Sequence, residues 1–144
     1  MKIYTSYFSN ANRLGAAGVK QIGISLFPPK WFTGVSMKQV APTMTLFKST
    51  WLNDEQYERR FRQEVLSKVD AWDFYQRLER VSDGKDVALC CFEKDRKDCH
   101  RKLVAEWLER ELGIEVPEFE EAMRRPSRKE EQKTKIEDLE PTLF

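Results

Sequence analysis

Apolar and polar positions along the chain predict three strands. The first covers Lys2–Phe8, and the second covers Val19–Phe27, where two prolines end it because proline has no backbone donor for a ladder. The third covers Asp86–Phe92, and its continuous apolar run is typical of a strand buried on both faces. We expect one more short edge strand at Ile114–Val116.

Apolar residues at helical spacing predict three helices. The first begins at a capping box made by Asn53 and Gln56, the second ends near Gly84, and the third runs from about His100 to Leu112. We expect the core positions to be Trp51, Tyr57, Phe61, Val65 and Val69, then Trp72, Tyr75 and Leu78, and finally Leu103, Val104, Trp107 and Leu108. Residues 28–52 show no clear period and predict an irregular connection with one or two helical turns.

Strands that alternate with helices predict an α/β fold. We expect a compact, Rossmann-like three-layer sandwich with a small, mostly parallel sheet and flanking helices. Residues 1–116 form this α/β domain in our interpretation, and residues 117–144 form a charged C-terminal extension that is partly helical or disordered. The segment Arg124–Glu140 holds six basic and five acidic residues, which is typical of a solvated tail.

Composition narrows the class of protein. The chain has 144 residues, of which 40% are hydrophobic and 34% charged, and its net charge is +1. Net charge therefore gives no argument for a nucleic-acid or membrane surface, and no apolar run approaches the roughly 20 residues that cross a bilayer. Three cysteines, two of them adjacent, argue against a disulfide framework, and the start of the chain lacks a signal-peptide pattern. We expect a cytoplasmic protein.

Three segments follow the carboxyl ends of the predicted strands, where open α/β sheets bind ligands. They are Ser6–Asn10, Ser25–Trp31 and Cys91–Arg101. The third segment carries the most chemistry. Cys99 opens a helix, where backbone N–H groups and the helix dipole lower the pKa of a thiol, and a cationic His100 would add to this effect.

The neighbouring residues complete the candidate site. We predict catalytic roles for Cys91, Glu93, Cys99 and His100, and substrate or anion binding by Arg101, Ser6, Ser25 and Trp31. Arginine can hold a phosphate or carboxylate by two hydrogen bonds, glutamate can accept a proton, and tryptophan can stack on a base.

Each of these residues also has a structural interpretation. Cys90 fits a core position, and Cys99 fits a small residue at a helix start. His100 can pair locally, and Glu93 with Arg101 can form a salt bridge that holds the loop to the helix. A zinc site is disfavoured, because Cys99 and His100 are adjacent and Cys90 and Cys91 point to opposite faces of a strand. We predict no metal site, and the sequence leaves the cofactor unknown.

The run from Leu89 to Arg101, L-C-C-F-E-K-D-R-K-D-C-H-R, resembles the C-x-E…C-H-R signature of the domain-of-unknown-function family 488, in its shorter branch. The resemblance places Cys91, Glu93, Cys99, His100 and Arg101 on the signature, extends over about residues 1–114, and implies a compact α/β fold without implying a defined activity. Longer members carry Asp-x-Arg after the second strand, and this chain has Ile-Ser-Leu-Phe at 24–27 instead.

These observations predict an enzyme with a Cys/Glu/His/Arg site that acts on an anionic substrate, either a nucleotide or a nucleic-acid-linked group. The alternative is a non-catalytic module that binds a phosphorylated ligand or nucleic acid. We expect no membrane association. The end of the chain, Ile136–Phe144, carries apolar residues on a polar tether and is a weaker candidate for docking to a protein partner.

Overall fold

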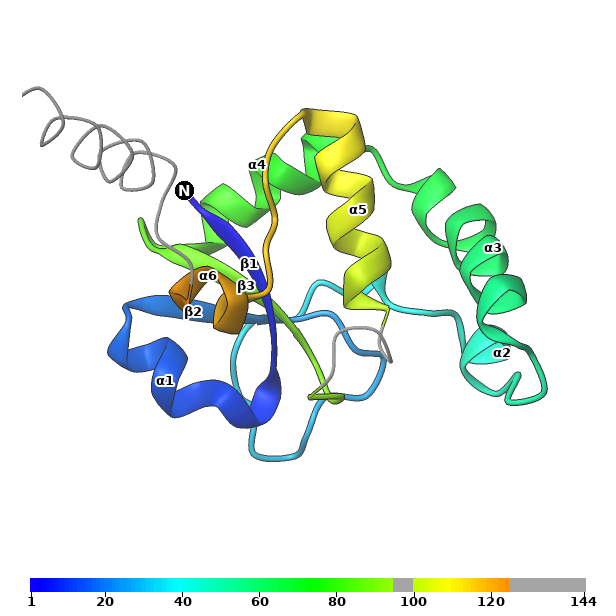
Figure 1. Cartoon of the computed structure of the whole chain (residues 1–144), viewed down its shortest axis with the longest axis horizontal. Helices are drawn as coiled ribbons and strands as arrows, with labels where there is room; N and C mark the ends of the chain where they lie inside the picture. Colours follow the sequence, from blue (N-terminus) through cyan, green and yellow to red (C-terminus); the bar gives the residue numbers. More distant parts are fainter. Residues whose placement is uncertain (95–99, 125–144) are drawn as a thin grey trace, which may run out of the picture.

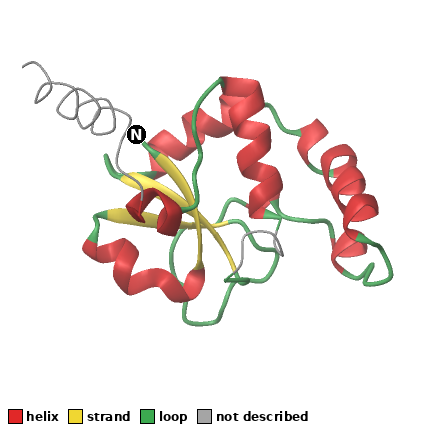
Figure 2. Cartoon of the chain, viewed as in Figure 1, coloured by secondary structure: helices red, strands yellow, loops and turns green. Residues whose placement is uncertain are grey.

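The computed structural model describes residues 1–94 and 100–124 and centres on a three-stranded parallel sheet (Figures 1 and 2). Its strands are β1 (Ile3–Tyr7), β2 (Val19–Gly23) and β3 (Asp86–Cys91), in the order β1-β3-β2. Strand β3 pairs with both neighbours, with Cys91 opposite Tyr7 and Cys90 opposite Gly23. The carboxyl ends of the three strands therefore meet at one edge, as the sequence predicts.

Six helices accompany the sheet in the described residues. They are α1 (Ala11–Ala16), α2 (Met44–Phe47), α3 (Asp54–Glu64), α4 (Ala71–Val81), α5 (Arg101–Leu112) and α6 (Phe119–Arg124), with single 3-10 turns at Phe8–Asn10, Lys38–Val40 and Leu66–Lys68. The predicted capping box starts α3, because the Asn53 side chain accepts from the Gln56 N–H at 2.8 Å and the Gln56 side chain accepts from the Asn53 N–H at 3.0 Å. Every helix in the described parts of the chain is too short or too polar to cross a bilayer.

The central strand contributes alternate residues to two hydrophobic clusters, one on each face of the sheet. Val87 and Leu89 pack with residues of α4 and α5, such as Phe74 and Val104. On the opposite face, Ala88 and Cys90 pack with Leu14 of α1 and Phe119 of α6. Helices cover both faces, so the predicted three-layer α/β sandwich is confirmed.

Three predicted element boundaries were wrong. Strand β2 ends at Gly23 rather than Phe27, although the N–H of Ile24 still donates to the Cys90 carbonyl at 3.0 Å. The first long helix ends at Glu64 instead of continuing to Val69, and α4 then begins with Asp70 as its own cap. No strand forms at 114–116. The chain forms a bridge with β1 just after this segment, between Thr5 and Glu118.

Two tryptophans predicted for the core lie on the surface. Trp51, in the connection between α2 and α3, is 76% exposed, and Trp72 of α4 is 57% exposed. Helix α4 buries Ala71, Phe74 and Leu78, so its apolar face is rotated from the predicted one. In α5, by contrast, the four predicted core residues are all buried.

Residues just after the predicted domain boundary at 116 pack against β1. The N–H of Thr5 donates to the carbonyl of Pro117 at 3.0 Å, and Phe119 packs edge-on against Tyr4 with ring centroids 5.5 Å apart. Helix α6 was expected from the partly helical segment, but its packing on β1 was not. Residues 125–144, which include the predicted docking segment, lie outside the described residues.

Candidate active site

The carboxyl ends of β2 and β3 open into a pocket of about 640 Å³. Four residues predicted for the site line it: Ser25 just after β2, Cys91 at the end of β3, Glu93 in the following loop, and His100 at the start of α5. These residues come from three segments of the chain, and the parallel register brings the segments together. The pocket therefore brings together three of the four predicted catalytic residues with Ser25.

Arg101, the first residue of α5, lies fully buried behind this pocket. Its Nε and Nη2 atoms donate to the carboxylate of Glu118 at 2.9–3.2 Å. Its Nη2 also donates to the Lys94 carbonyl at 2.9 Å, while Nη1 donates to the Glu93 carbonyl and to Cys91 Sγ, the latter at 3.1 Å. All of the guanidinium N–H groups thus have acceptors within the protein.

This geometry corrects the role predicted for Arg101. A guanidinium whose donors are all used by Glu118, the loop carbonyls and Cys91 has none left for the two-point binding of an anion. The salt bridge considered between Glu93 and Arg101 is also replaced, because Glu93 contributes its backbone carbonyl and Glu118 supplies the carboxylate. Arg101 is a positioning residue, because its hydrogen bonds join the loop after β3, the end of β3 and the segment after α5.

His100 is buried and hydrogen-bonded to the backbone. Its Nε2 lies 2.6 Å from the Ile24 carbonyl, and its ring packs on Phe61 with centroids 5.5 Å apart. A carbonyl can only accept, so Nε2 carries the hydrogen. Burial, and to a smaller extent the charge of Arg101, lowers the pKa of His100 to about 4. The imidazole is neutral at pH 7, which corrects the expectation of an imidazolium beside a thiol.

The two adjacent cysteines differ sharply in their surroundings. Cys90 carries a free thiol within the cluster formed with Leu14 and Phe119, and burial raises its pKa to about 12. Cys91 lines the pocket, touches Arg101 and is disulfide-bonded. The structural interpretation of Cys90 is thereby confirmed, whereas the disulfide at Cys91 was not predicted, since the sequence argues only against a disulfide framework.

A family comparison bears on these residues. The chain matches the family model described as the active DUF488-N3 subclade over residues 11–112. The chain belongs to the DUF488 family. No curated protein and no solved structure matches it. Within the DUF488 match lie the signature residues Cys91, Glu93, His100 and Arg101, which the structure places around the end of β3.

Two further predicted site residues of this DUF488 chain, Ser6 and Trp31, do not line the pocket. Ser6 is buried on the opposite face of the sheet, where its hydroxyl accepts from Asn10 at 3.2 Å. Trp31 is exposed and packs edge-on against Phe8. Ser6 faces away because alternate residues of β1 point to opposite faces. Cys99 lies outside the described residues.

The sequence reasoning missed Glu118 and Tyr57. Glu118 was assigned to a solvated extension, although an acidic residue enclosed by Val116, Pro117 and Phe119 is a pattern that fits a buried partner for an arginine. Tyr57 was assigned only to the core, but it lines the pocket beside Phe27 and Phe47, and burial raises the pKa of its phenol to about 12. The pocket wall is therefore aromatic as well as polar.

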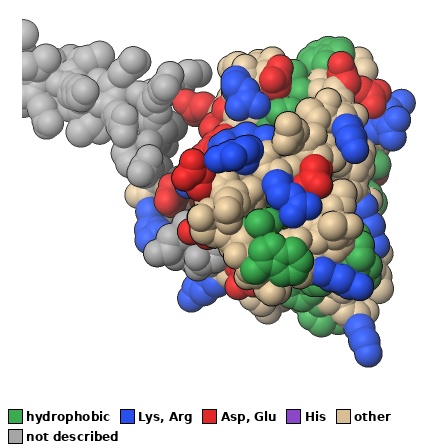
Figure 3. All heavy atoms as spheres, turned by 90° about the vertical axis from the view of Figure 1, so that its right-hand side faces the viewer, with side chains coloured by type: hydrophobic (Ala, Val, Ile, Leu, Met, Phe, Trp, Pro, Cys, Tyr) green, Lys and Arg blue, Asp and Glu red, His purple; other side chains and the backbone are tan. Residues whose placement is uncertain are grey.

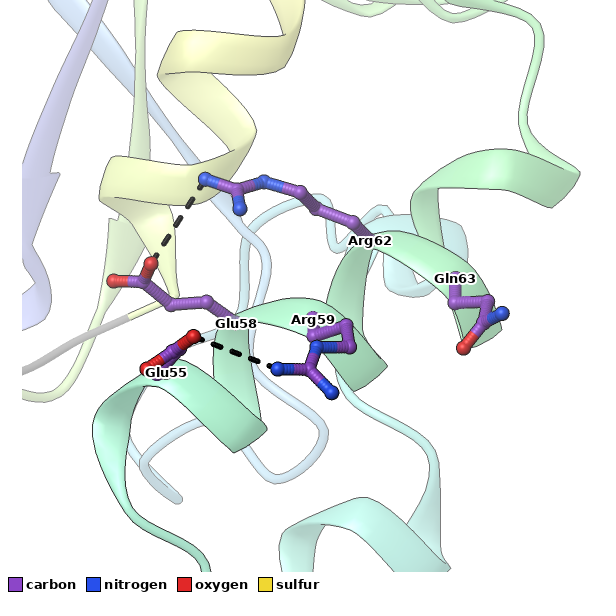
Figure 4. Close-up of a pocket in the computed structure, with 5 residues that line it drawn as sticks. All are labelled: Glu55, Glu58, Arg59, Arg62 and Gln63. Carbon is purple, nitrogen blue, oxygen red and sulfur yellow. Dashed lines mark hydrogen bonds and ion pairs between the residues drawn. The ribbon is translucent and has the colours of Figure 1, made fainter.

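A second, shallower hollow of about 370 Å³ lies on α3 and is lined by Glu55, Glu58, Arg59, Arg62 and Gln63 (Figure 4). Two of its ion pairs, Glu55 with Arg59 and Glu58 with Arg62, join residues one helical turn apart. The hollow is a solvated helix face, and Glu58 also lines the pocket at the strand ends. Within the described residues, no group of three His, Cys, Asp or Glu side chains is placed to hold a metal ion.

Proposed function

We propose that this protein is an enzyme whose active site is the pocket at the ends of β2 and β3, with a thiolate of Cys91 as nucleophile. The contact between Arg101 Nη1 and Cys91 Sγ, at 3.1 Å, carries the proposal. A buried guanidinium that donates to a sulfur favours the thiolate over the thiol once the disulfide is reduced. The description of the matching subclade as active supports an enzyme.

The other pocket residues supply supporting roles. In the proposed reaction, the Cys91 thiolate attacks an electrophilic carbon, a carbon–sulfur bond forms, and the leaving group departs with the bonding electrons and takes a proton from solvent. Water then attacks the same carbon, Glu93 accepts a proton from that water, and the carbon–sulfur bond breaks to restore the thiolate. His100 positions the start of α5 by its hydrogen bond to Ile24.

The pocket lining favours an anionic, nucleotide-like substrate. The aromatic rings of Phe27, Phe47 and Tyr57 offer surfaces for a planar base. The first turn of α5, with Lys102 on the pocket wall, offers backbone N–H groups and a cation for an anionic group. Because disulfides are kept reduced in the cytoplasm, we assign the active form of the protein to that compartment.

A binding module without chemistry is the second candidate. Two observations favour it: Cys91 is disulfide-bonded, and His100 is neutral with its Nε2 committed to a backbone carbonyl. In such a module the same pocket would hold the ligand, and Arg101 would serve only to join the segments around it.

Alkylation of the reduced protein separates the two candidates. We expect iodoacetamide to modify Cys91 with a rate that reaches half its maximum at least one pH unit below the value of about 8.5 typical of a free cysteine. The modified residue is identified by mass spectrometry. Cys90 is the internal control, because its buried thiol, with a pKa of about 12, should react only after unfolding in urea. A half-maximal pH of 8.5 or above at Cys91 would reject the enzyme and leave the binding module.

A further inference from the structure

Exposed aromatic and basic side chains gather in the loop after β2 and around α2. They are Phe27, Lys30, Trp31, Phe47, Lys48 and Trp51, which together we call the aromatic–lysine surface. Each of its four aromatic residues is at least 51% exposed, and Trp51 reaches 76%. Soluble proteins rarely leave several large aromatic side chains together in solvent unless the surface binds something.

Ring contacts show how this surface lies relative to the pocket. Phe27 and Phe47 line the pocket and meet edge-on with centroids 5.6 Å apart, so the loop after β2 and α2 lie side by side at its rim. Trp31 contacts Phe8 at 6.4 Å, and Phe8 contacts Phe92, another rim residue, at 5.4 Å. The exposed rings therefore flank the pocket mouth. Hydrophobic side chains are visible among Lys, Arg, Asp and Glu side chains on the face that α2 and α3 present (Figure 3).

Although the net charge of the chain is only +1, its acidic residues are distributed unevenly along the sequence. Residues 1–53 contain six basic residues and no acidic one, and the first acidic residue is Asp54. The remaining residues contain 19 basic and 24 acidic side chains. The aromatic–lysine surface falls entirely within the part that lacks acidic residues, so its lysines, Lys30 and Lys48, have no carboxylate on their own loops to neutralise them.

We propose that the aromatic–lysine surface binds single-stranded nucleic acid across the mouth of the pocket. Exposed tryptophans stack on bases without requiring a particular sequence, and lysines neutralise the phosphates between them. Trp31 and Trp51 provide the stacking platforms, and Lys30 and Lys48 the phosphate contacts. This binding does not depend on the thiol chemistry proposed above, because none of these four residues lines the pocket.

A lipid surface is the other polyanion that tryptophan and lysine can recognise. Peripheral membrane binding usually uses a long amphipathic helix with a continuous apolar face. Here the helix on the surface, α2, has only four residues, and the two tryptophans lie on separate connections. Separate rings interspersed with lysines fit a strand of bases and phosphates better than they fit a bilayer.

Fluorescence polarisation with a fluorescein-labelled oligothymidylate and the full chain tests the proposal. At about 50 mM salt we expect binding, and we expect Trp31→Ala and Trp51→Ala each to weaken it about 5- to 100-fold. Lys30→Ala and Lys48→Ala should weaken it and should lower the slope of log affinity against log salt by about 0.7 each, the value for a single strand.

Matched controls lie elsewhere on the surface. Trp72 is 57% exposed, as Trp31 is, and Lys85 is also exposed, but both belong to the acid-containing part of the chain. Trp72→Ala and Lys85→Ala should leave the affinity within about 2-fold of the parent protein.

Three results would overturn the proposal: no binding of the oligonucleotide at low salt, an equal loss in the Trp72→Ala variant, or unchanged affinity in both surface tryptophan variants. Binding to vesicles that contain phosphatidylserine, without binding to the oligonucleotide, would replace nucleic acid by a membrane. The pH dependence of Cys91 alkylation should be the same in Trp31→Ala and Trp51→Ala, so failure of this proposal can be told apart from failure of the proposed enzyme.

Discussion

The two faces of the sheet are formed by the same strands, but the side chains buried beside them differ strongly in polarity and charge. On the face covered by α1 and α6, the buried side chains are apolar apart from a thiol and a few neutral polar groups, and Cys90 is held there with its pKa raised to about 12. Around the carboxyl ends of β2 and β3, the buried groups include His100, Arg101 and Glu118. Cys91, one position further along the chain, contacts that arginine.

This difference shows that the face of the strand, rather than the residue type, decides what a cysteine can do here. Alternation along β3 sends Cys90 into a hydrophobic cluster, where desolvation favours the neutral thiol. It sends Cys91 towards a cation and a cavity. We call the face covered by α1 and α6 the closed face, and the region around the carboxyl ends of β2 and β3 the pocket side. Three tests, in order of decreasing effect, ask whether the stability of the pocket side depends on its buried polar groups as much as that of the closed face depends on packing.

The largest effect should come from Glu118→Ala. The variant leaves the buried guanidinium of Arg101 without its carboxylate, and breaking a buried ion pair by removing one partner costs about 3–5 kcal/mol. The free energy of unfolding from urea denaturation measures this loss. Glu55→Ala is the matched control, because it removes an exposed ion pair with Arg59 of the kind that contributes about 0–1 kcal/mol. A loss below about 1 kcal/mol in Glu118→Ala would mean that the Arg101 cluster does not hold the pocket side together.

The sequence predicted well what depends on local pattern. The three parallel strands, the capping box of α3 and the buried face of α5 follow from residue spacing, and the convergence of Ser25, Cys91 and His100 follows from strand ends that share one edge. Each of these features needs information from only a few neighbouring residues or from a general rule of parallel sheets.

The sequence could not predict contacts that depend on how distant segments pack. Arg101 looked available for an anion because its partner, Glu118, follows the turn after α5 and comes back to the site only when α6 packs on β1. Trp72 looked like a core residue because helical spacing predicts that α4 has an apolar face. Which face of α4 is buried, however, depends on how the helix packs on the sheet. Trp51 was misplaced for a related reason, since an irregular connection has no period to interpret.

An intermediate effect should appear as pH dependence of stability through His100. Its pKa is about 4 in the folded protein, mainly because of burial, against about 6.5 when unfolded. Between these values the unfolded chain binds the additional proton, so stability should fall as the pH is lowered from about 6.5 to 4, by up to about 3 kcal/mol. His100→Gln keeps a donor for the Ile24 carbonyl but does not titrate. The difference in unfolding free energy between the two proteins should therefore change with pH in this window, and a constant difference would contradict the burial of a neutral imidazole.

The smallest effect compares a glycine near α5 with one in α1 on the closed face. Gly113 ends α5 with φ at 66°, a left-handed conformation, and its N–H donates to the Glu109 carbonyl at 2.9 Å. An added Cβ would meet no atom within 4 Å at Gly113 or at Gly15 of α1, so substitution by alanine changes only backbone preferences. We expect Gly113→Ala to lose about 1 kcal/mol because alanine disfavours positive φ. Gly15→Ala should gain about 0.5–1 kcal/mol because it lies inside a helix. Thermal unfolding of both variants measures the two shifts, and shifts of the same sign would show that α5 does not end at a left-handed residue.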